Sequence, residues 1–263
     1  MSGAASRTQS APIQVLRTNG GRAAELVLDA GRGNVIDSGV IAALRDAVRD
    51  LASERRLCAV LLTHTGEHFS YGASVPEHAP GEVGRMLPAF HALALELLAL
   101  ERPLLAAVGG ACLGGGLELG CTADLLFASP SASFGQPEIA LGVFAPLGSL
   151  LLPRRIGAGA AADLLLSGRR IDASEALRIG LARELAADPA AAARAWIGQH
   201  LVGRSAEALR HATRAARASW WPDFATRLAA LERAYLVDLQ AAHDAREGIA
   251  AFLDKRAPRW EDR

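Results

Sequence analysis

Apolar residues follow two different spacings along this chain, and each spacing predicts a different element. Residues 58–63 (CAVLLT) and 103–108 (PLLAAV) are short, continuous apolar runs, typical of strands in a sheet that is covered on both faces. Residues 13–18 and 23–29 are predicted to be two further strands around the turn NGGR. Residues 35–54 form a predicted helix, because their apolar side chains recur at helical spacing: Ile36, Val40, Ile41, Leu44, Val48 and Leu51.

Helical patterns also cover later parts of the chain, in residues 85–101, 156–184 and 190–202. Strands therefore alternate with helices through about residue 185, which predicts an α/β arrangement. From about residue 186 to residue 255 the pattern predicts helices alone, and Leu228, Leu231, Tyr235 and Leu236 share one helical face.

This distribution divides the 263 residues into three predicted parts. Residues 1–12 have the composition of a disordered tail, residues 13–200 form an α/β core, and residues 201–263 form a C-terminal helical region. A chain of this length is able to bury a large hydrophobic core.

The charges balance, with 28 Lys and Arg residues against 28 Asp and Glu residues. Nucleic-acid-binding proteins usually carry a basic excess, and polybasic membrane anchors need clustered cations, so we expect neither kind of partner. No apolar run reaches the ~20 residues of a membrane-spanning helix, and the N-terminal residues lack the apolar segment of a secretory signal. All cations but one are arginines, and the single lysine is Lys255.

The three cysteines, Cys58, Cys112 and Cys121, are scattered and lack the spacing of a disulfide framework or a metal site. We therefore expect reduced, mostly buried thiols and a cytoplasmic protein. No metal or separate cofactor is predicted.

A glycine cluster carries the strongest candidate chemistry. A predicted strand leads into Gly114-Gly115-Gly116-Leu117-Glu118, where a helix opens. Glycines allow a ligand to approach the backbone closely, and the start of a helix presents unpaired N–H groups that suit an anion or a developing oxyanion. The alternative is a tight turn packed against a neighbouring strand, with Glu118 on the surface.

A second carboxylate, Glu138, follows a strand-like segment and the sequence Phe134-Gly135-Gln136-Pro137. Two glutamates on separate rigid elements that met across a pocket would hold unequal pKa values, because like charges in a desolvated site cannot both ionise easily. Such a pair transfers protons near neutral pH. Taken alone, each glutamate is equally consistent with a capping or salt-bridged surface group.

Four segments, in this order and spacing, resemble the enoyl-CoA hydratase/isomerase (crotonase) superfamily. They are HFSYGAS at 68–74, GGACLGGGLELGCTAD at 109–124, FGQPEIALG at 134–142 and AREGIAAFLDKRAP at 245–258. The resemblance covers essentially residues 13–258. It implies a spiral ββα core and C-terminal helices that mediate trimerisation, often as a dimer of trimers.

The resemblance also implies a ligand and roles for particular residues. The ligand is an acyl-CoA thioester, with coenzyme A as part of the substrate. By position, the backbone N–H groups of Ala73 and Gly115 resemble the family's oxyanion-hole donors. Glu118 and Glu138 stand where hydratases of the family carry both catalytic glutamates, without indicating which is the acid and which the base.

Other positions are implied to contact the substrate or coenzyme A. They are Ser70, Tyr71, Gly72 and Gly114 beside the oxyanion donors, Phe144 and Pro146 beside the acyl group, and Phe252 and Lys255 near the charged end of coenzyme A. A lysine suits a phosphate as a point charge. The alternative for Lys255 is a solvated helix end, where a cation is favoured by the helix dipole.

The segment after FGQPEIALG departs from the family's usual glycine-rich turn. Pro146 and Leu147 replace flexible glycines and Phe144 is added, which predicts a stiffer, more apolar wall that suits a planar ring. In HFSYGAS and GVFAP the chain resembles cyclohexa-1,5-dienecarbonyl-CoA hydratases of anaerobic aromatic degradation.

The predicted activity is therefore hydration of an α,β-unsaturated CoA thioester whose acyl group is a cyclic diene. The reaction is expected to pass through an enolate that the oxyanion donors stabilise. Straight-chain 2-enoyl-CoA hydration remains an alternative, as do isomerase or dehalogenase chemistry on the same scaffold. A non-catalytic relative that binds CoA or RNA fits less well, because both glutamates are present and the sequence has no cluster of basic residues of the kind that binds RNA.

Overall fold

The structure, a computed structural model, describes residues 11–263. The predicted tail at residues 1–12 falls almost wholly on residues 1–10, which lie outside the described residues. A six-stranded sheet in the order β1-β2-β3-β4-β6-β9 forms the centre, with β1 antiparallel to β2 and the other neighbours parallel. Its strands are β1 (Ile13–Thr18), β2 (Ala23–Leu28), β3 (Ala59–His64), β4 (Leu104–Val108), β6 (Leu125–Ala128) and β9 (Glu184–Leu185).

A smaller sheet in the order β5-β7-β8 lies beyond the carboxyl end of β4. It consists of β5 (Ala111–Leu113), β7 (Ser133–Gly135) and β8 (Arg170–Asp172), with β5 and β7 parallel and β8 antiparallel to β7. Because only two residues separate β4 from β5, the chain passes directly from the large sheet into the small one. As a result, the glycine cluster at residues 114–116, which follows β5 directly, is buried inside the molecule.

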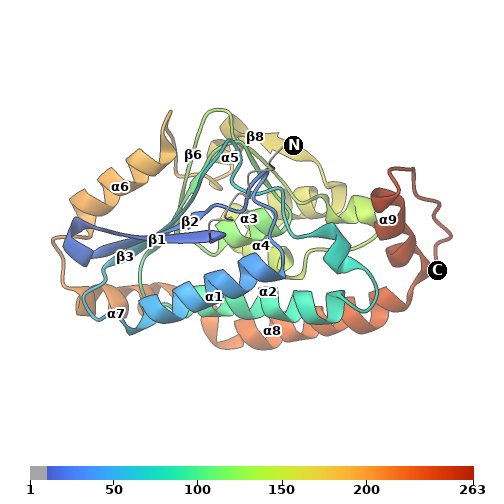
Figure 1. The fold of residues 1–263 in the computed structure, drawn as a ribbon, viewed down its shortest axis with the longest axis horizontal. Helices are drawn as coiled ribbons and strands as arrows, with labels where there is room; N and C mark the ends of the chain where they lie inside the picture. Colours follow the sequence, from blue (N-terminus) through green and yellow to red (C-terminus); the bar gives the residue numbers. More distant parts are fainter. Residues whose placement is uncertain (1–10) are drawn as a thin grey trace, which may run out of the picture.

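Helices cover both faces of the main sheet (Figure 1), and α1, α2 and α8 form one layer. No helix in residues 11–263 has the length and apolar character needed to cross a membrane. The α-helices are α1 (Ser38–Ser53), α2 (Val83–Leu98), α3 (Gly115–Cys121), α4 (Pro146–Ser167), α5 (Ala173–Arg178), α6 (Pro189–His200), α7 (Ala206–Arg217), α8 (Trp221–Arg233) and α9 (His243–Leu253). The short helices are the 3-10 turns η1 (Asn19–Gly21), η2 (Val75–His78) and η3 (Pro137–Leu141) and the π-helix η4 (Ala234–Leu239).

Strand β4 explains why a continuous apolar run was the right signal for a central strand. Its alternate residues Leu104 and Ala106 join the large core beneath α1 and α2. The residues between them, Leu105 and Ala107, join a second core formed with α6. Because side chains alternate between the faces of a strand and both faces are covered, every position must be apolar.

The predicted helix at 35–54 is confirmed as α1, whose buried face contains the predicted residues from Val40 to Leu51. Asp37 caps it by accepting a hydrogen bond from the Val40 N–H at 2.8 Å. The prediction of one helical stretch over 156–184 is wrong. Helix α4 starts ten residues earlier at Pro146 and ends where Gly168 adopts a left-handed conformation, and β8, α5 and β9 follow. Strands of two and three residues are too short to show periodicity.

Residues 186–253 contain helices only, as predicted. Helix α6 packs on the main sheet through Ala193 and Ile197, whereas α8 packs on α2 and α4, and α9 packs on η2 and η3. The division at residue 200 remains a prediction, and it coincides with the end of α6. The three cysteines are free and buried, as expected.

Candidate active site

A cleft of about 610 Å³ opens where four elements meet: the loop after β3, the start of α3, η3 and the start of α4. Helix α2 and the π-helix η4 close its apolar side. Most of the residues predicted from the sequence line this cleft, namely Tyr71, Gly72, Ala73, Gly114, Gly115, Glu118, Glu138, Phe144 and Pro146. The structure therefore brings together three motifs that lie far apart along the chain.

Two backbone N–H groups face the cleft side by side. A Cβ atom on Gly115 would stand 3.1 Å from the nitrogen of Ala73, so the two residues are in close contact. Within residues 11–263, neither the Ala73 N–H nor the Gly115 N–H donates a hydrogen bond to a protein acceptor. Two adjacent N–H donors without a protein partner, at the start of a helix, are able to bind an oxyanion.

The loop that carries Ala73 is fixed on both sides. The Ile36 N–H donates to the carbonyl of Gly72, and the Ser74 N–H donates to the carbonyl of Ile36, both at 2.9 Å. Gly72 has φ +107°, and a Cβ there would lie 2.8 Å from the carbonyl oxygen of Leu113. Only glycine allows this close approach between the loop and β5.

Ser70 supports this loop instead of lining the cleft. Its side chain is fully buried; the hydroxyl donates to the carbonyl of Asn34 at 2.8 Å and accepts from the Gly72 N–H at 3.0 Å. Ser70 is not among the residues that line the cleft, and its only hydrogen-bond donor is used within the protein, so contact of Ser70 with substrate remains a prediction. Its effect is to orient the peptide that precedes the Ala73 donor.

Glu118 lies in the first turn of α3 and is only 6% exposed, which excludes the surface alternative. Its carboxyl oxygen accepts a hydrogen bond from the Gly148 N–H at 2.6 Å. Gly148 belongs to the first turn of α4, whose N–H groups lack partners within the helix. The start of α4 therefore holds the carboxyl group of Glu118, and its dipole favours the charged form.

Glu138 lies in η3 and reaches the same cleft. Its Oε1 accepts a hydrogen bond from the Gln136 side-chain amide at 3.3 Å, while its Oε2 is buried and has no partner within the described residues. The same amide nitrogen would stand 3.0 Å from a Cβ on Gly148. Gln136 thus contacts Glu138 and lies close to Gly148, the residue that binds Glu118. Its place in the FGQPEIALG motif did not by itself indicate this position.

The electrostatics of the two glutamates follow from their burial. Loss of hydration raises the pKa of Glu118 to about 7, against the opposing effect of the hydrogen bond from Gly148. Burial, together with the nearby charge of Glu118, raises the pKa of Glu138 to about 8. Two carboxyl groups coupled in this way do not both ionise easily near neutral pH, so the pair is able to hold one proton between them.

The remaining wall of the cleft is apolar and aromatic. The rings of Phe144 and Tyr235 have centroids 5.6 Å apart at an angle of 56°, and Leu87 and Phe90 of α2 line the same side. The predicted stiff turn is correct only as far as Ala145, because Pro146 is already the first residue of α4. Proline suits that position, since its fixed φ matches the helix and its missing N–H is not needed.

Tyr235 also lines the cleft, although the sequence pattern indicated only that it lies on one face of a helix. It comes from η4, nearly a hundred residues after Glu138. No local pattern marked it, because its approach to the cleft depends on how the C-terminal helices pack.

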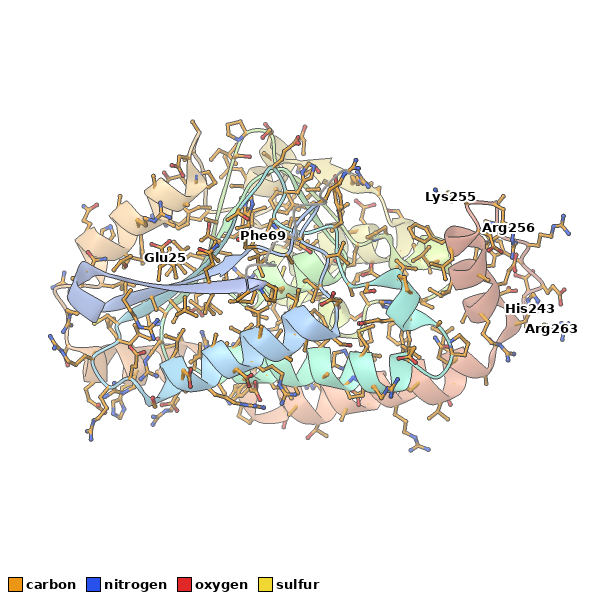
Figure 2. All side chains as sticks on the ribbon, in the orientation of Figure 1. Glu25, Phe69, His243, Lys255, Arg256 and Arg263 are labelled. Atoms are coloured by element: carbon orange, nitrogen blue, oxygen red, sulfur yellow. The ribbon has the colours of Figure 1, made fainter. Side chains whose placement is uncertain are left out.

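Phe252 and Lys255 do not line the cleft of this chain. Figure 2 shows Lys255 and Arg256 at the outer end of α9, well separated from Phe69 in the interior, and Phe252 is 53% exposed. Arg256 forms an ion pair with Glu247 at 2.6 Å, whereas no ion pair of Lys255 is found within residues 11–263. Contact of Phe252 and Lys255 with coenzyme A remains a prediction.

Within the described residues, no group of three or more His, Cys, Asp and Glu side chains is arranged to hold a metal ion. The polar side chains that line the cleft are Glu118, Glu138, Tyr235, Tyr71 and His78. The His78 ring nitrogen Nδ1 already contacts the Ser74 carbonyl at 2.9 Å.

Comparisons with known proteins agree with this geometry. The family model for enoyl-CoA hydratase/isomerase matches residues 24–263. Cyclohexa-1,5-dienecarbonyl-CoA hydratase from Thauera aromatica is 48% identical over 254 residues, which cover 97% of this chain and 98% of that protein. A Mycobacterium bovis protein named as a probable enoyl-CoA hydratase is 36% identical over 233 residues, which cover 88% of this chain and 90% of that protein.

Among solved structures, an enoyl-CoA hydratase/isomerase from Pseudoalteromonas atlantica superimposes with a TM-score of 0.84 at 27% sequence identity. The superposition covers 95% of this chain and 99% of that chain. The predicted α/β crotonase fold, with two mixed sheets and C-terminal helices, is thereby confirmed.

The glycine at position 72 provides a test of the oxyanion site. Because a Cβ there would collide with the Leu113 carbonyl, Gly72→Ala must displace the Ala73 N–H. We expect turnover of an enoyl-CoA thioester to fall by about 100-fold or more. Gly81→Ala is the matched control, since Gly81 also has a positive φ, of +92°, but no atom lies within 4 Å of its Cβ position. Equal losses in the two variants would contradict the site.

The raised carboxyl pKa values predict a pH-dependent cost in stability. Glu138 keeps its proton in the folded state up to about pH 8, whereas its unperturbed pKa is 4.5. Stability is therefore full below the unfolded pKa and falls as the pH rises towards the folded one. We expect Glu138→Gln to unfold at a higher temperature than the wild type, by a margin that grows from pH 5 to pH 8 in calorimetric scans.

Glu67→Gln is the matched control, because the Glu67 side chain is 85% exposed. Its unfolding temperature should follow the wild type at every pH. A Glu138→Gln margin that stays constant across this range would show that the carboxyl group does not keep its proton on folding.

Proposed function

This chain belongs to the enoyl-CoA hydratase/isomerase family, and on that basis we propose that it adds water to a cyclic dienoyl-CoA thioester. The observation that carries the proposal is the arrangement around one cleft of the buried Glu118, of Glu138 with its buried Oε2, and of two unpaired N–H donors. Addition of water needs a base, an acid and a stabiliser of negative charge, and this arrangement supplies all three.

In the proposed reaction the thioester oxygen accepts hydrogen bonds from the Ala73 and Gly115 N–H groups. As the water oxygen bonds to the β-carbon, the electrons of the double bond move onto that thioester oxygen and form an enolate. The two donors are already in place and have no other partner in the described chain, and each such donor is worth about 3 kcal/mol in a transition state.

The two glutamates handle the protons. One, as a carboxylate, takes a proton from water while the oxygen bonds to carbon. The other, as a carboxylic acid, gives its proton to the α-carbon or, where a second double bond extends the conjugation, to the far carbon of that system. The proton count balances, and a shared proton near neutral pH prepares the pair for this exchange.

The shape of the cleft supports a ring as the acyl group. The Phe144 and Tyr235 rings and the rigid Pro146 form a broad apolar wall of the cleft that also holds the acidic groups. Such a wall suits a flat ring. The relative from Thauera aromatica, named for a cyclic dienoyl substrate, supports the same choice.

Straight-chain 2-enoyl-CoA hydration is the second candidate. It is favoured by the 36% identical relative, which is named as a probable enoyl-CoA hydratase, a name that mentions no cyclic substrate. Isomerase chemistry would use the same oxyanion site but needs only one proton carrier, so the presence of two buried acids supports hydration.

Further proposals concern the surroundings of the reaction. We propose that Phe252 and Lys255 meet the charged end of coenzyme A bound to a neighbouring chain, since both are exposed and outside the cleft of their own chain. Assembly as a homotrimer or a dimer of trimers would create that contact. The three free, buried thiols support a cytoplasmic location.

The glutamates provide the first test of this mechanism. Glu118→Gln and Glu138→Gln should each lower kcat for hydration by about 100-fold or more, because each removes one proton carrier. Binding of a saturated acyl-CoA thioester should stay within a few fold of the wild type in both variants, as measured by calorimetry. Near-wild-type turnover by either variant would exclude the proposed mechanism.

The substrate is tested by a direct comparison. Steady-state hydration of cyclohexa-1,5-dienecarbonyl-CoA and of crotonyl-CoA, followed at the ultraviolet enoyl band, should show a kcat/KM at least 10-fold higher for the ring. A 3-enoyl thioester in the same panel separates isomerase activity. A strong preference for crotonyl-CoA would replace the cyclic substrate with the straight-chain alternative.

A further inference from the structure

Tyr235 is a polar residue of the cleft that the two-glutamate mechanism leaves without a task, and unlike Tyr71 and His78, which also line the cleft, it comes from the C-terminal helices. It lies in η4, the π-helix that interrupts the C-terminal helices between α8 and α9. A π-helical turn is rare, inserts an extra residue and often marks a functional site. Here it directs a tyrosine into the cleft, where the side chain lines the pocket and is only 1% exposed.

The hydroxyl of Tyr235 meets the geometry of a hydrogen bond with no group of the described residues, although the Gln240 side chain lies beside it and opposes the rise in its pKa. Three other buried polar atoms in this region, Glu138 Oε2, Gln136 Oε1 and Gln240 Nε2, also lack a partner there. Buried polar groups in native proteins are nearly always satisfied. Tyr235 and Glu138 both line the cleft, and each has a buried oxygen without a partner in the described residues, so a polar ligand atom that enters between them would complete the set.

Tyr235 can act as a hydrogen-bond donor but not as a base. Burial and the nearby charges of Glu138 and Glu118 raise its pKa far above the physiological range. The phenol therefore keeps its proton throughout the reaction and serves as a hydrogen-bond donor, not as a base. A donor beside two acidic groups is suited to an oxygen atom that carries lone pairs.

We propose that Tyr235 is a further catalytic residue, whose hydroxyl donates a hydrogen bond to the oxygen of the reacting water and then to the product hydroxyl. This role rests on the proposed hydration. Water gives one proton to a glutamate, its oxygen bonds to the β-carbon, and the other glutamate supplies a proton to carbon. Tyr235 neither gains nor loses a proton; it fixes the oxygen so that a lone pair points at the carbon.

A purely structural role for Tyr235 is the competing explanation. Its ring packs among Val83, Leu87, Val143 and Ala245, and this packing does not need the hydroxyl. Tyr235→Phe keeps the ring and removes only the oxygen, so the variant separates the two explanations.

We expect kcat for hydration to fall about 10- to 100-fold in Tyr235→Phe, with little change in KM. The hydroxylated product should inhibit the variant about 10-fold more weakly than the wild type, whereas a saturated thioester without a hydroxyl should inhibit both equally. This difference between the two inhibitors is the decisive measurement, because a general disturbance of the pocket would weaken the binding of both inhibitors.

Thr213→Val is the matched control, since it removes a buried hydroxyl on α7 outside the cleft. Its kcat and both inhibition constants should equal those of the wild type. Unfolding temperatures of both variants should stay close to the wild type.

Two further outcomes would overturn the proposal, and they do so at different levels. In the first outcome the wild type hydrates the thioester, and Tyr235→Phe has the same kcat and the same product inhibition. This outcome would exclude Tyr235 from the reaction and leave the glutamate mechanism intact. A wild type that hydrates no enoyl-CoA thioester would overturn the proposed function and the role of Tyr235 with it.

Discussion

The active cleft depends on keeping two carboxyl groups buried next to each other. Glu118 and Glu138 would repel as anions, and water is largely excluded around them. The fold offsets this with the first turn of α4, where the Gly148 N–H binds Glu118, and with the Gln136 amide, which binds Glu138. Because these contacts are few and burial dominates, both pKa values stay high enough for the pair to share a proton near neutral pH.

The rest of the architecture places this pair in one cleft with the proposed oxyanion donors. The short connection from β4 to β5 brings Gly115 beside Ala73, and hydrogen bonds from Ile36 and Ser74 fix the facing loop. The donors therefore need no rearrangement when charge develops on a ligand oxygen, which is the condition under which such donors are most effective. The C-terminal helices complete the enclosure, since η4 adds an aromatic wall and a hydroxyl to the apolar side of the cleft.

Local signals predicted the elements well where they were long, and failed where they were short. The buried face of α1 and the apolar run of β4 followed from periodicity, because each has one or two covered faces along its whole length. Strands β8 and β9 were missed since they depend on pairing with β7 and β6. Ser70 was predicted to touch the substrate, but it supports the loop, and no feature of its own segment distinguishes these two roles.

The sequence by itself determined the alternation of strands and helices, the family resemblance, and the candidates for the two glutamates and the two oxyanion donors. It did so because these features lie in short segments whose spacing and residue types can be recognised without knowledge of their contacts. Only the tertiary structure decided that Glu118 is buried against α4, that Gln136 contacts Glu138 and lies close to Gly148, and that Tyr235 lines the cleft. Each of these depends on contacts between segments far apart in the chain, and such contacts form only when the whole core packs.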